Sequence, residues 1–329
     1  MSLCKSRVFV FAFFLTFFSY NCFASNNNYG FTRWLQGFET KALSAGVSRA
    51  TLDETLPHIT FLEKVIEYDR RQPDKTMSFN KYITNVIPQK KITMARSKYS
   101  ENSKLLKKIG AKYKVQPRFI VALWALESNF GTNMGNFDVI DSLASLAYEG
   151  RRRDFFTDEL INALKIIDKG PITKEELKGS WAGAMGQSQF MPSSFLKMAV
   201  AYGHDGQPDI WNKKSDVFAS IANYLAQNGW NNQSTWGREV KLPKNFSKAM
   251  IGKSIEKNIS EWNKLGVRLK TGGKLATSKG KMLASLIQPD EGGKSRTFLV
   301  YSNYKTILKW NRSLYFATSV GLLSDKIAE

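Results

Sequence analysis

The sequence predicts a mainly helical α+β protein, and three features of the 329-residue chain support that class. Apolar residues recur at helical spacing from Phe31 to about residue 231. The alternation of apolar and polar residues that is typical of strands is confined to 232–302, and helical spacing returns in 304–322. The chain is 43% hydrophobic, which is enough for one large core or for two to three packed domains.

Residues 1–24 are predicted to be a secretory signal peptide and not part of the fold. Lys5 and Arg7 precede the apolar run 8–18, and small residues suit cleavage after Ala24. The apolar run is too short for a comfortable membrane span. We therefore expect export, with the periplasm as the location.

Both cysteines, Cys4 and Cys22, fall in the signal peptide. The mature chain is thus expected to hold no disulfide, no thiol nucleophile and no cysteine-based zinc site. Bacterial lipoproteins carry a lipidated cysteine near the place of Cys22, but residues 19–21 match such a signal poorly, so we expect no lipid anchor. The histidines, His58 and His204, are far apart in sequence, which disfavours a zinc site.

The net charge is +20, and loss of Lys5 and Arg7 with the signal peptide lowers it by two, to +18. A strongly basic exported protein favours a polyanionic partner. Export argues against nucleic acid, whereas a carboxylate-rich cell-wall polymer or an anionic membrane surface fits the compartment. Peripheral association with a membrane is left open. The basic residues are dispersed, so scattered solubilising charge remains the alternative.

The range 25–100 is predicted to be an N-terminal helical domain. Residues 25–30 form an Asn-rich leader that we expect to be flexible. After a first helix from Phe31, Ser48 is expected to cap a second one, and 91–113 has the pattern of one long basic helix.

The range 101–231 is predicted to be the core domain. Pro117 suits the first turn of a helix that carries Glu127, and Gly131 suits its end. Further helices are expected at 141–164, after a capping box at Thr173–Glu176, from a cap at Ser193 or Ser194 to Ala201, and at 216–228.

The range 232–302 is predicted to be a small subdomain that contains β structure. Its candidate strands are 238–242, 282–287 and 297–301, and pairs of glycines nearby are typical of turns. The range 303–329 is expected to be a helical segment that returns to the helical domains.

Glu127 is the leading candidate for a catalytic group. It closes a run that is otherwise nearly all apolar, and burial raises the pKa of a carboxyl group. A carboxylic acid that stays protonated near neutral pH can protonate the leaving oxygen of a glycoside. Leu123, Trp124 and Phe130 lie on the same side at helical spacing, as a wall that could desolvate the acid and stack on sugars. The alternatives are a solvated surface glutamate and ordinary core residues.

The segment 179–194 is the second candidate feature. Its glycines let the backbone approach a ligand closely. Ser180, Gln187 and Gln189 supply neutral groups that could bind sugar hydroxyls, and Phe190 supplies apolar contact. A purely structural loop with tight turns is the alternative.

Together the two features resemble the lytic murein transglycosylase B family. The motifs are Glu-Ser-x-Phe-Gly at 127–131 and Gly-Ala-Met-Gly-Gln-Ser-Gln-Phe-Met-Pro-Ser-Ser at 183–194. Further matches are Arg151-Arg152 with Phe155-Phe156, Asp209-Ile-Trp, and Trp310-Asn311, so that the resemblance covers about 30–322.

The resemblance implies a lysozyme-like catalytic core in 101–231 and cleavage of the β-1,4 bond between N-acetylmuramic acid and N-acetylglucosamine in peptidoglycan. The product carries a 1,6-anhydromuramic end. Glu127 matches the family's single catalytic acid and base. The positions that match the family's glycan cleft are Tyr82, Arg152, Ser180, Gln189, Phe190 and Asn311. Cell-wall synthases are left open as partners.

A single acid agrees with the carboxylates in the sequence. Most glycosidases need two. Here Asp138 and Asp141 have the pattern of helix-start residues, and Glu149 and Asp154 flank arginines with which they could pair. In a substrate-assisted reaction, the acetamide of the muramic acid takes the place of the second carboxylate. A muramidase that uses water, and a wall-binding scaffold without activity, remain the alternatives.

Calcium is the one metal that the resemblance raises, because some members bind it in a loop that corresponds to 201–211. Ala201 stands where a calcium loop has its first Asp, and Gly203 occupies the third position. Asp205, Asp209 and Asp216 remain. We therefore expect weak calcium binding or none, and no other cofactor.

Overall fold

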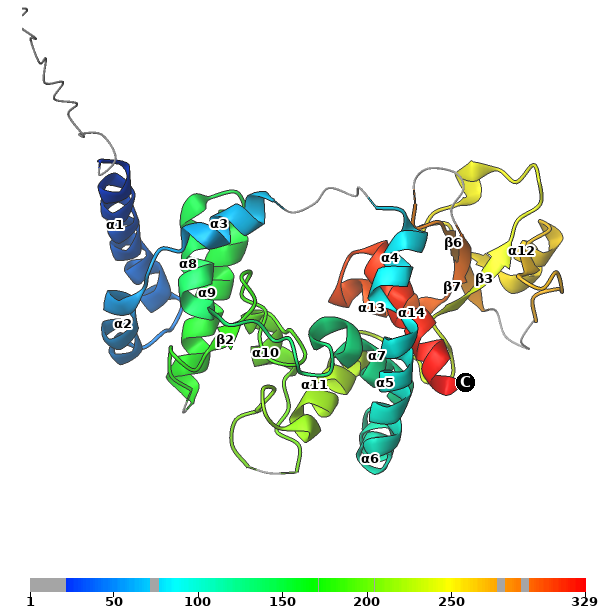
Figure 1. Cartoon of the computed structure of the whole chain (residues 1–329), viewed down its shortest axis with the longest axis horizontal. Coiled ribbons are helices and arrows are strands. Elements are labelled where there is room, and N and C mark those ends of the chain that lie inside the picture. The colour runs from blue at the N-terminus through cyan, green and yellow to red at the C-terminus, as the bar shows by residue number, and fades with distance from the viewer. Residues whose placement is uncertain (1–21, 72–76, 171, 204, 277–281, 291–295) are drawn as a thin grey trace, which may run out of the picture.

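The computed structural model describes residues 22–71, 77–170, 172–203, 205–276, 282–290 and 296–329. Most of the predicted signal peptide, including Cys4, lies outside these ranges, as does His204. The chain is mainly helical with a small antiparallel sheet, which confirms the predicted fold class (Figure 1). Within the described residues, none of the helices combines the length and apolarity that a membrane crossing requires.

The helices account for most of the chain. They are α1 (Cys22–Ser44), α2 (Arg49–Thr55), α3 (Glu63–Arg70), α4 (Phe79–Val86), α5 (Gln89–Glu101), α6 (Ser103–Tyr113), α7 (Pro117–Ser128), α8 (Val139–Glu149), α9 (Arg153–Lys169), α10 (Pro192–Met198), α11 (Lys214–Gln227), α12 (Ile259–Lys264), α13 (Ser302–Trp310) and α14 (Leu314–Ala328), with the short 3-10 helices η1 (Leu56–His58) and η2 (Lys248–Met250). In Figure 1, α1, α2, α3, α8 and α9 gather at one end, and α4 to α7 gather with α13 and α14 nearer the other.

The strands form two sheets. One pairs β1 (Phe137–Asp138) with β2 (Lys178–Gly179), and the other has the order β4-β6-β7-β3-β5, antiparallel throughout. The strands of the larger sheet are β3 (Gly237–Lys241), β4 (Lys257–Asn258), β5 (Arg268–Leu269), β6 (Leu283–Ile287) and β7 (Thr297–Val300). The three strands expected from the sequence are therefore confirmed as β3, β6 and β7.

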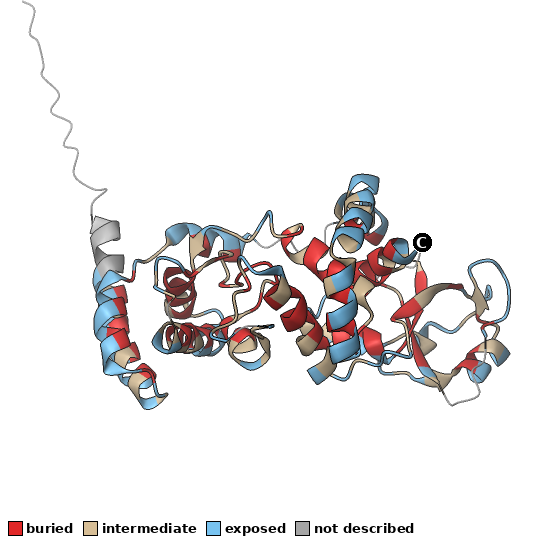
Figure 2. Ribbon diagram, turned by 90° about the horizontal axis from the view of Figure 1, so that it is seen from below, coloured by how far each residue is buried: buried red, intermediate tan, exposed pale blue. Residues whose placement is uncertain are grey.

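One continuous hydrophobic core extends through the helices, from Phe31 on α1 to Ile327 on α14 (Figure 2). The sheet has a smaller core of its own, built around Trp262. Side chains alternate along a strand, and in β7 Phe298 reaches the main core whereas Leu299 reaches the small one. The boundaries proposed at 100, 231 and 302 stay a prediction, since the helical ranges on both sides of 100 share a core.

Two helix starts agree with the sequence. The Ser48 hydroxyl accepts a hydrogen bond from the backbone N–H of Thr51, so Ser48 caps α2. Pro117 occupies the first turn of α7, where its missing N–H leaves no intrahelical bond unmade.

Three expectations about where helices begin and end are wrong, including that of a flexible leader at 25–30. The leader 25–30 is part of α1, because a helix that is anchored by buried Phe31 extends at little cost. The long helix 91–113 is interrupted at Asn102, whose side-chain amide donates to the Lys98 carbonyl. The stretch 141–164 is divided at Gly150, which ends α8 with a left-handed φ of 95°.

Two expected caps also differ from the structure. Thr173 and Glu176 do exchange the two hydrogen bonds of a capping box, but a turn follows and the chain then enters β2. Helix α10 begins at Pro192 after Met191, so neither Ser193 nor Ser194 is its cap. The residue before a proline is held extended, which sets this boundary.

Candidate functional site

Glu127 lies in the last turn of α7, a helix that is buried over most of its length. The helix ends at Ser128 and is followed by the cap residue Asn129, two residues before the expected Gly131. Asn129, Phe130 and Gly131 all have positive φ, of 49°, 63° and 83°. Asparagine tolerates this left-handed conformation better than most residues do, and the sharp turn leaves Glu127 at the free end of the helix.

The Glu127 carboxyl group is half-buried and has one strong partner. Trp310, at the end of α13, donates its indole N–H to Glu127 Oε1 at 2.6 Å. Burial raises the pKa of Glu127 to about 7, and the hydrogen bond from Trp310 opposes this rise because it favours the charged form. Burial and the negative charge of Glu127 together raise the pKa of Tyr82 on α4, so the two groups share one electrostatic environment.

The aromatic wall around Glu127 is built from other residues than the sequence suggested. Trp124 is 1% exposed, and Phe130 packs edge-on against it with ring centroids 5.3 Å apart, so both belong to the core. Trp310 is instead held by Tyr224 and Phe190, at 4.7 and 5.2 Å between ring centroids. The expected desolvation of the acid is present, but stacking of a sugar on Trp124 or Phe130 is ruled out.

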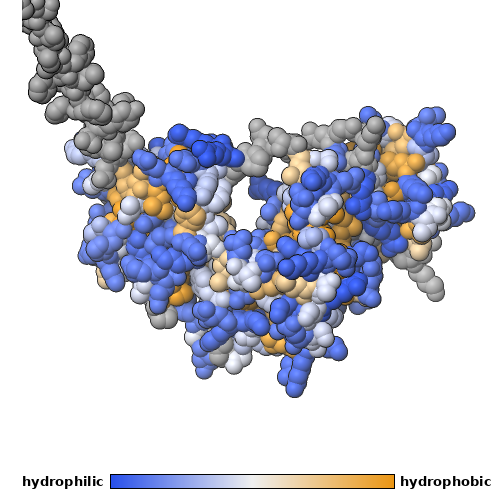
Figure 3. All heavy atoms as spheres, in the orientation of Figure 1, coloured by the Kyte–Doolittle hydropathy of each residue, from blue (hydrophilic) through white to orange (hydrophobic). Residues whose placement is uncertain are grey.

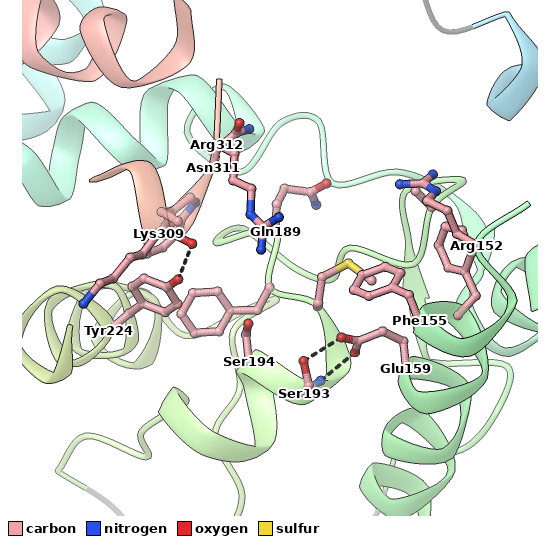
Figure 4. Close-up of a pocket in the computed structure, with 15 residues that line it drawn as sticks. Arg152, Phe155, Glu159, Gln189, Ser193, Ser194, Tyr224, Lys309, Asn311 and Arg312 are labelled. Carbon is pink, nitrogen blue, oxygen red and sulfur yellow. Dashed lines mark hydrogen bonds between the residues drawn. The ribbon is translucent and has the colours of Figure 1, made fainter. Parts of the chain in front are cut away.

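A cavity of about 680 Å³ lies beside the Trp310 ring. In Figure 4, Arg152, Phe155 and Glu159 line one wall near the start of α9, and Lys309, Asn311 and Arg312 line the opposite wall at the end of α13. The full lining, called here the glycan pocket, is Arg152, Phe155, Phe156, Glu159, Ala182, Gln189, Phe190, Met191, Ser193, Ser194, Tyr224, Lys309, Trp310, Asn311 and Arg312. Figure 3 shows the surface notched between the two helical groups.

Four of the residues that the resemblance assigned to a glycan cleft line this pocket: Arg152, Gln189, Phe190 and Asn311. The other two lie elsewhere. Tyr82 packs against Tyr315, with ring centroids 5.2 Å apart. The Ser180 hydroxyl accepts the backbone N–H of Ala184 and closes a turn.

Arg152 is positioned by a buried carboxylate. Its guanidinium donates to Oδ1 of Asp69 at 2.8 Å, and Arg151 makes two further bonds to the same carboxylate. Burial alone would raise the pKa of Asp69, but the two arginines outweigh burial and hold the pKa below its usual range. The Arg152 guanidinium also lies 4.6 Å from the Phe156 ring centroid. Asp69 thus fixes the charged wall of the pocket.

Gln187 has a structural task, which corrects its assignment to sugar binding. Its side chain accepts the indole N–H of Trp124 at 2.8 Å and donates to the Trp211 carbonyl at 2.6 Å. Gln189, which does line the pocket, has a φ of 49° and donates to the carbonyls of Met134 and Gly186.

The glycines of the 183–194 motif allow the chain to approach itself, not a ligand as the sequence suggested. A Cβ at Gly183 would lie 2.5 Å from the Leu143 side chain. A Cβ at Gly186 would lie 2.7 Å from both the side chain and the carbonyl oxygen of Ile210. The structural alternative therefore holds for these two positions.

Sequence reasoning missed Glu159, a second carboxylate at the pocket. It is 5% exposed and accepts the backbone N–H and the hydroxyl of Ser193, at 2.8 and 2.6 Å. Both of its oxygens are thus engaged in holding the start of α10. Trp310 was also missed as the partner of the acid, since it lies 183 residues further along the chain.

Of the other carboxylates, Asp138 and Asp141 lie at a helix start, as the sequence predicted. Asp138 caps α8, and both Asp138 and Asp141 bind the ammonium of Lys174, at 3.0 and 2.9 Å. Glu149 pairs with Arg70 at 3.1 Å and not with an arginine of the run that it flanks, and no ion pair of Asp154 is found within the described part of the chain. None of these lines the glycan pocket.

Among the described residues of the loop 201–211, the acidic side chains are Asp205 and Asp209. Ala201 and Gly203 have no side-chain oxygen, and the Asp216 carboxylate accepts backbone N–H groups from Tyr202 and Asp209, at 3.1 and 2.9 Å. Oδ1 of Asp209 likewise accepts two backbone N–H groups. Hydrogen bonds to the backbone thus engage the carboxylates of Asp209 and Asp216.

Comparison with known proteins gives a consistent result. The transglycosylase SLT domain family matches residues 30–325. Membrane-bound lytic murein transglycosylase B of Escherichia coli strain K12 is 30% identical over 223 residues, which are 66% of this chain. The chain spans 58% of the length of that relative.

Solved structures share the fold, and two of them are described here. SltB3 from Pseudomonas aeruginosa, in complex with NAG-NAM-pentapeptide, is 38% identical with a TM-score of 0.86, over 91% of this chain and 79% of that one. The lytic transglycosylase Slt35 of Escherichia coli, solved in complex with calcium, is 26% identical with a TM-score of 0.76, over 89% and 92% of the two chains.

Proposed function

Because this chain belongs to the transglycosylase SLT domain family, we propose that it is a lytic transglycosylase. Its substrate is peptidoglycan, in which it cleaves the β-1,4 bond between N-acetylmuramic acid and N-acetylglucosamine. The observation that carries the proposal is Glu127, whose pKa burial raises to about 7 and whose hydrogen-bond donor, Trp310, lines the glycan pocket. The complex of SltB3 with NAG-NAM-pentapeptide supports a peptide-bearing glycan strand as the ligand.

In the proposed reaction Glu127 acts twice. As an acid, it protonates the glycosidic oxygen while the bond to C1 of the muramic residue breaks. The acetamide of that sugar stabilises the positive charge that develops at C1. As a base, the Glu127 carboxylate then takes the proton from the 6-hydroxyl as that oxygen attacks C1. The attack is intramolecular, so correct orientation supplies much of the rate.

The rest of the pocket binds and orients the strand. We assign glycan contacts to Arg152, Gln189, Phe190 and Asn311, which line the pocket. Tyr82 and Ser180 are proposed as contacts outside its lining. Glu159 is excluded as a second catalytic carboxylate because Ser193 occupies both of its oxygens.

Analysis of the digestion products tests the proposal. Purified peptidoglycan is incubated with the protein, and the masses of the released muropeptides are measured. Products with 1,6-anhydromuramic ends, 18 Da lighter than the hydrolysed forms by loss of one water, are expected. Free reducing ends would instead indicate a muramidase that uses water. Binding to the wall without any product would indicate a scaffold.

The reaction is expected to depend on pH through Glu127. The first step needs the protonated form, so kcat/KM should fall as the pH rises through about 7. In Trp310→Phe, loss of the indole N–H removes a bond that favours the charged form, so the pKa of Glu127 rises. The alkaline fall should then shift upward by roughly half to one pH unit.

The control for this variant is Trp230→Phe, which removes an indole bond to Gln116 outside the glycan pocket. Its pH profile should match that of the wild type. An unshifted profile in Trp310→Phe would contradict the proposed control of Glu127 by Trp310.

We also propose that the protein works without calcium. The carboxylates of Asp209 and Asp216 accept backbone N–H groups, so we expect no bound ion for a chelator to remove. Addition of EDTA, or of 5–10 equivalents of calcium, should move the melting temperature by less than about 1 °C, whereas an ion that binds the native state would raise it. A calcium-dependent rise in the melting temperature would show that the loop binds the ion.

The proposed location is the periplasm, where the peptidoglycan substrate lies, and cell-wall synthases are proposed as partners. The basic composition of the chain supports association with an anionic wall polymer.

A further inference from the structure

A second, basic pocket adjoins the glycan pocket. Its volume is about 440 Å³, and its lining consists of Lys253, Lys305, Leu308, Lys309 and Arg312. Lys309 and Arg312 also line the glycan pocket, so the two cavities meet at the end of α13. Four of the five lining residues are cationic, and none is acidic.

The positive charge of this basic pocket is only partly neutralised. Lys305 pairs with Glu256 at 2.9 Å, and the ammonium of Lys309 donates to the Asn228 carbonyl at 3.0 Å. Within the described part of the chain, Lys253 and Arg312 make no ion pair with a carboxylate. A ligand with carboxylates could therefore bind without displacing more than one existing salt bridge.

The cations are held close together by two separate elements. Lys305 and Lys309 are four residues apart on α13 and so lie on one side of the helix, where like charges repel. Lys253 lies in a turn that the sheet fixes, because Gly252 donates its N–H to the Leu286 carbonyl and Ser285 donates to the Lys253 carbonyl. Repulsion among these cations lowers the stability of the free protein, and a bound anionic ligand would reduce this repulsion.

We propose that the basic pocket binds carboxylates of the stem peptide carried by a muramic acid residue in or next to the glycan pocket. This inference rests on the proposed function. The peptide is attached to the sugar through a lactyl group, so it leaves the glycan strand at the side of the chain. The shared wall of Lys309 and Arg312 gives it a continuous path from one cavity to the other. Lysine and arginine side chains bind carboxylates by charge-assisted hydrogen bonds.

The test compares strands with and without stem peptides. Binding is measured by calorimetry in the Glu127→Gln background, with soluble glycan fragments that are either intact or stripped of peptide by an amidase. The variant is Lys253→Gln with Lys305→Gln, since neither residue lines the glycan pocket. The matched control is Lys107→Gln with Lys108→Gln, two exposed lysines on α6.

The expected result is about a fivefold rise in Kd for intact fragments in the pocket variant, the magnitude of two exposed ion pairs. Kd for stripped fragments should stay the same, as should both values in the control. An equal change for both ligands, or no change for either, would overturn the inference. The proposed function and the inference can fail separately. A wild type that cleaves neither kind of strand would refute the proposed function, whereas the role of the basic pocket is decided by the Kd values.

The same anion chemistry could come from a lipid. Vesicles with 30% phosphatidylglycerol therefore form a second arm of the experiment, because basic residues bind anionic membranes at roughly 1 kcal/mol each. A loss of vesicle binding in the pocket variant, together with unchanged Kd values for intact fragments, would assign the pocket to a membrane surface and overturn the proposal. Unchanged vesicle binding, together with the fivefold rise in Kd for intact fragments, would support the proposal.

Discussion

Replacement of Glu127 by glutamine is expected to lower the rate of glycan cleavage by about 10³-fold, the usual contribution of a general acid and base. The amide keeps the size of the side chain, and its carbonyl oxygen can still accept the Trp310 indole N–H. It cannot supply a proton to the glycosidic oxygen or remove one from the 6-hydroxyl. The measurement is the initial rate of muropeptide release, with the melting temperature as a check that the fold is intact.

Two further variants test whether the loss of rate is specific to Glu127. Glu54→Gln changes an exposed glutamate on α2 and should retain the wild-type rate. Glu159→Gln loosens the contact with Ser193 at the pocket wall, so it should raise KM more than it lowers kcat. If Glu159→Gln lowered kcat as much as Glu127→Gln does, a reaction with one carboxylate would be wrong.

Replacement of Gly186 by alanine is expected to destabilise the protein by about 3 kcal/mol, because two costs add. The position has a φ of 62°, which is unfavourable for a residue with a Cβ. The Cβ would also lie 2.7 Å from the Ile210 carbonyl oxygen, so the backbone would have to move. Denaturant unfolding measures the loss.

Gly203→Ala is the matched control for this effect. Its φ is 79°, but a Cβ there would meet no atom within 4 Å among the described residues beyond its chain neighbours, so the conformational cost of about 1 kcal/mol remains. If the two variants were equally stable, the close packing of Gly186 against Ile210 would not be a source of stability.

The sequence was sufficient for the features that depend on local patterns. The Ser48 cap, the position of Pro117 and the strands β3, β6 and β7 each follow from a few adjacent residues. The desolvation of Glu127 could also be predicted, because the apolar run before it makes a buried helix.

The predictions that were wrong concern features that depend on contacts between residues far apart in the sequence. Trp124 has the spacing of a wall beside Glu127, yet Gln187, 63 residues later, binds its indole and fixes it in the core. The indole that reaches Glu127 is that of Trp310, which no local period relates to the acid. Glu159 was overlooked for the same reason, since only the fold brings Ser193 to it.

The motif glycines show a different limit. A glycine that approaches a ligand and one that approaches another part of the chain look alike in sequence. Only the position of Ile210 shows that Gly186 belongs to the second kind.

The sheet has a consequence for the acidity of Glu127 through β7. The helix α13 begins two residues after β7 ends, and its last residue, Trp310, is the hydrogen-bond donor to Glu127. Since Phe298 packs into the main core and Leu299 into the small one, β7 is anchored on both faces. The position of the Trp310 indole N–H is therefore set by strand packing outside the glycan pocket. The pKa of Glu127 is thus thermodynamically linked to the folding of the β-containing subdomain, which precedes Trp310 in the chain.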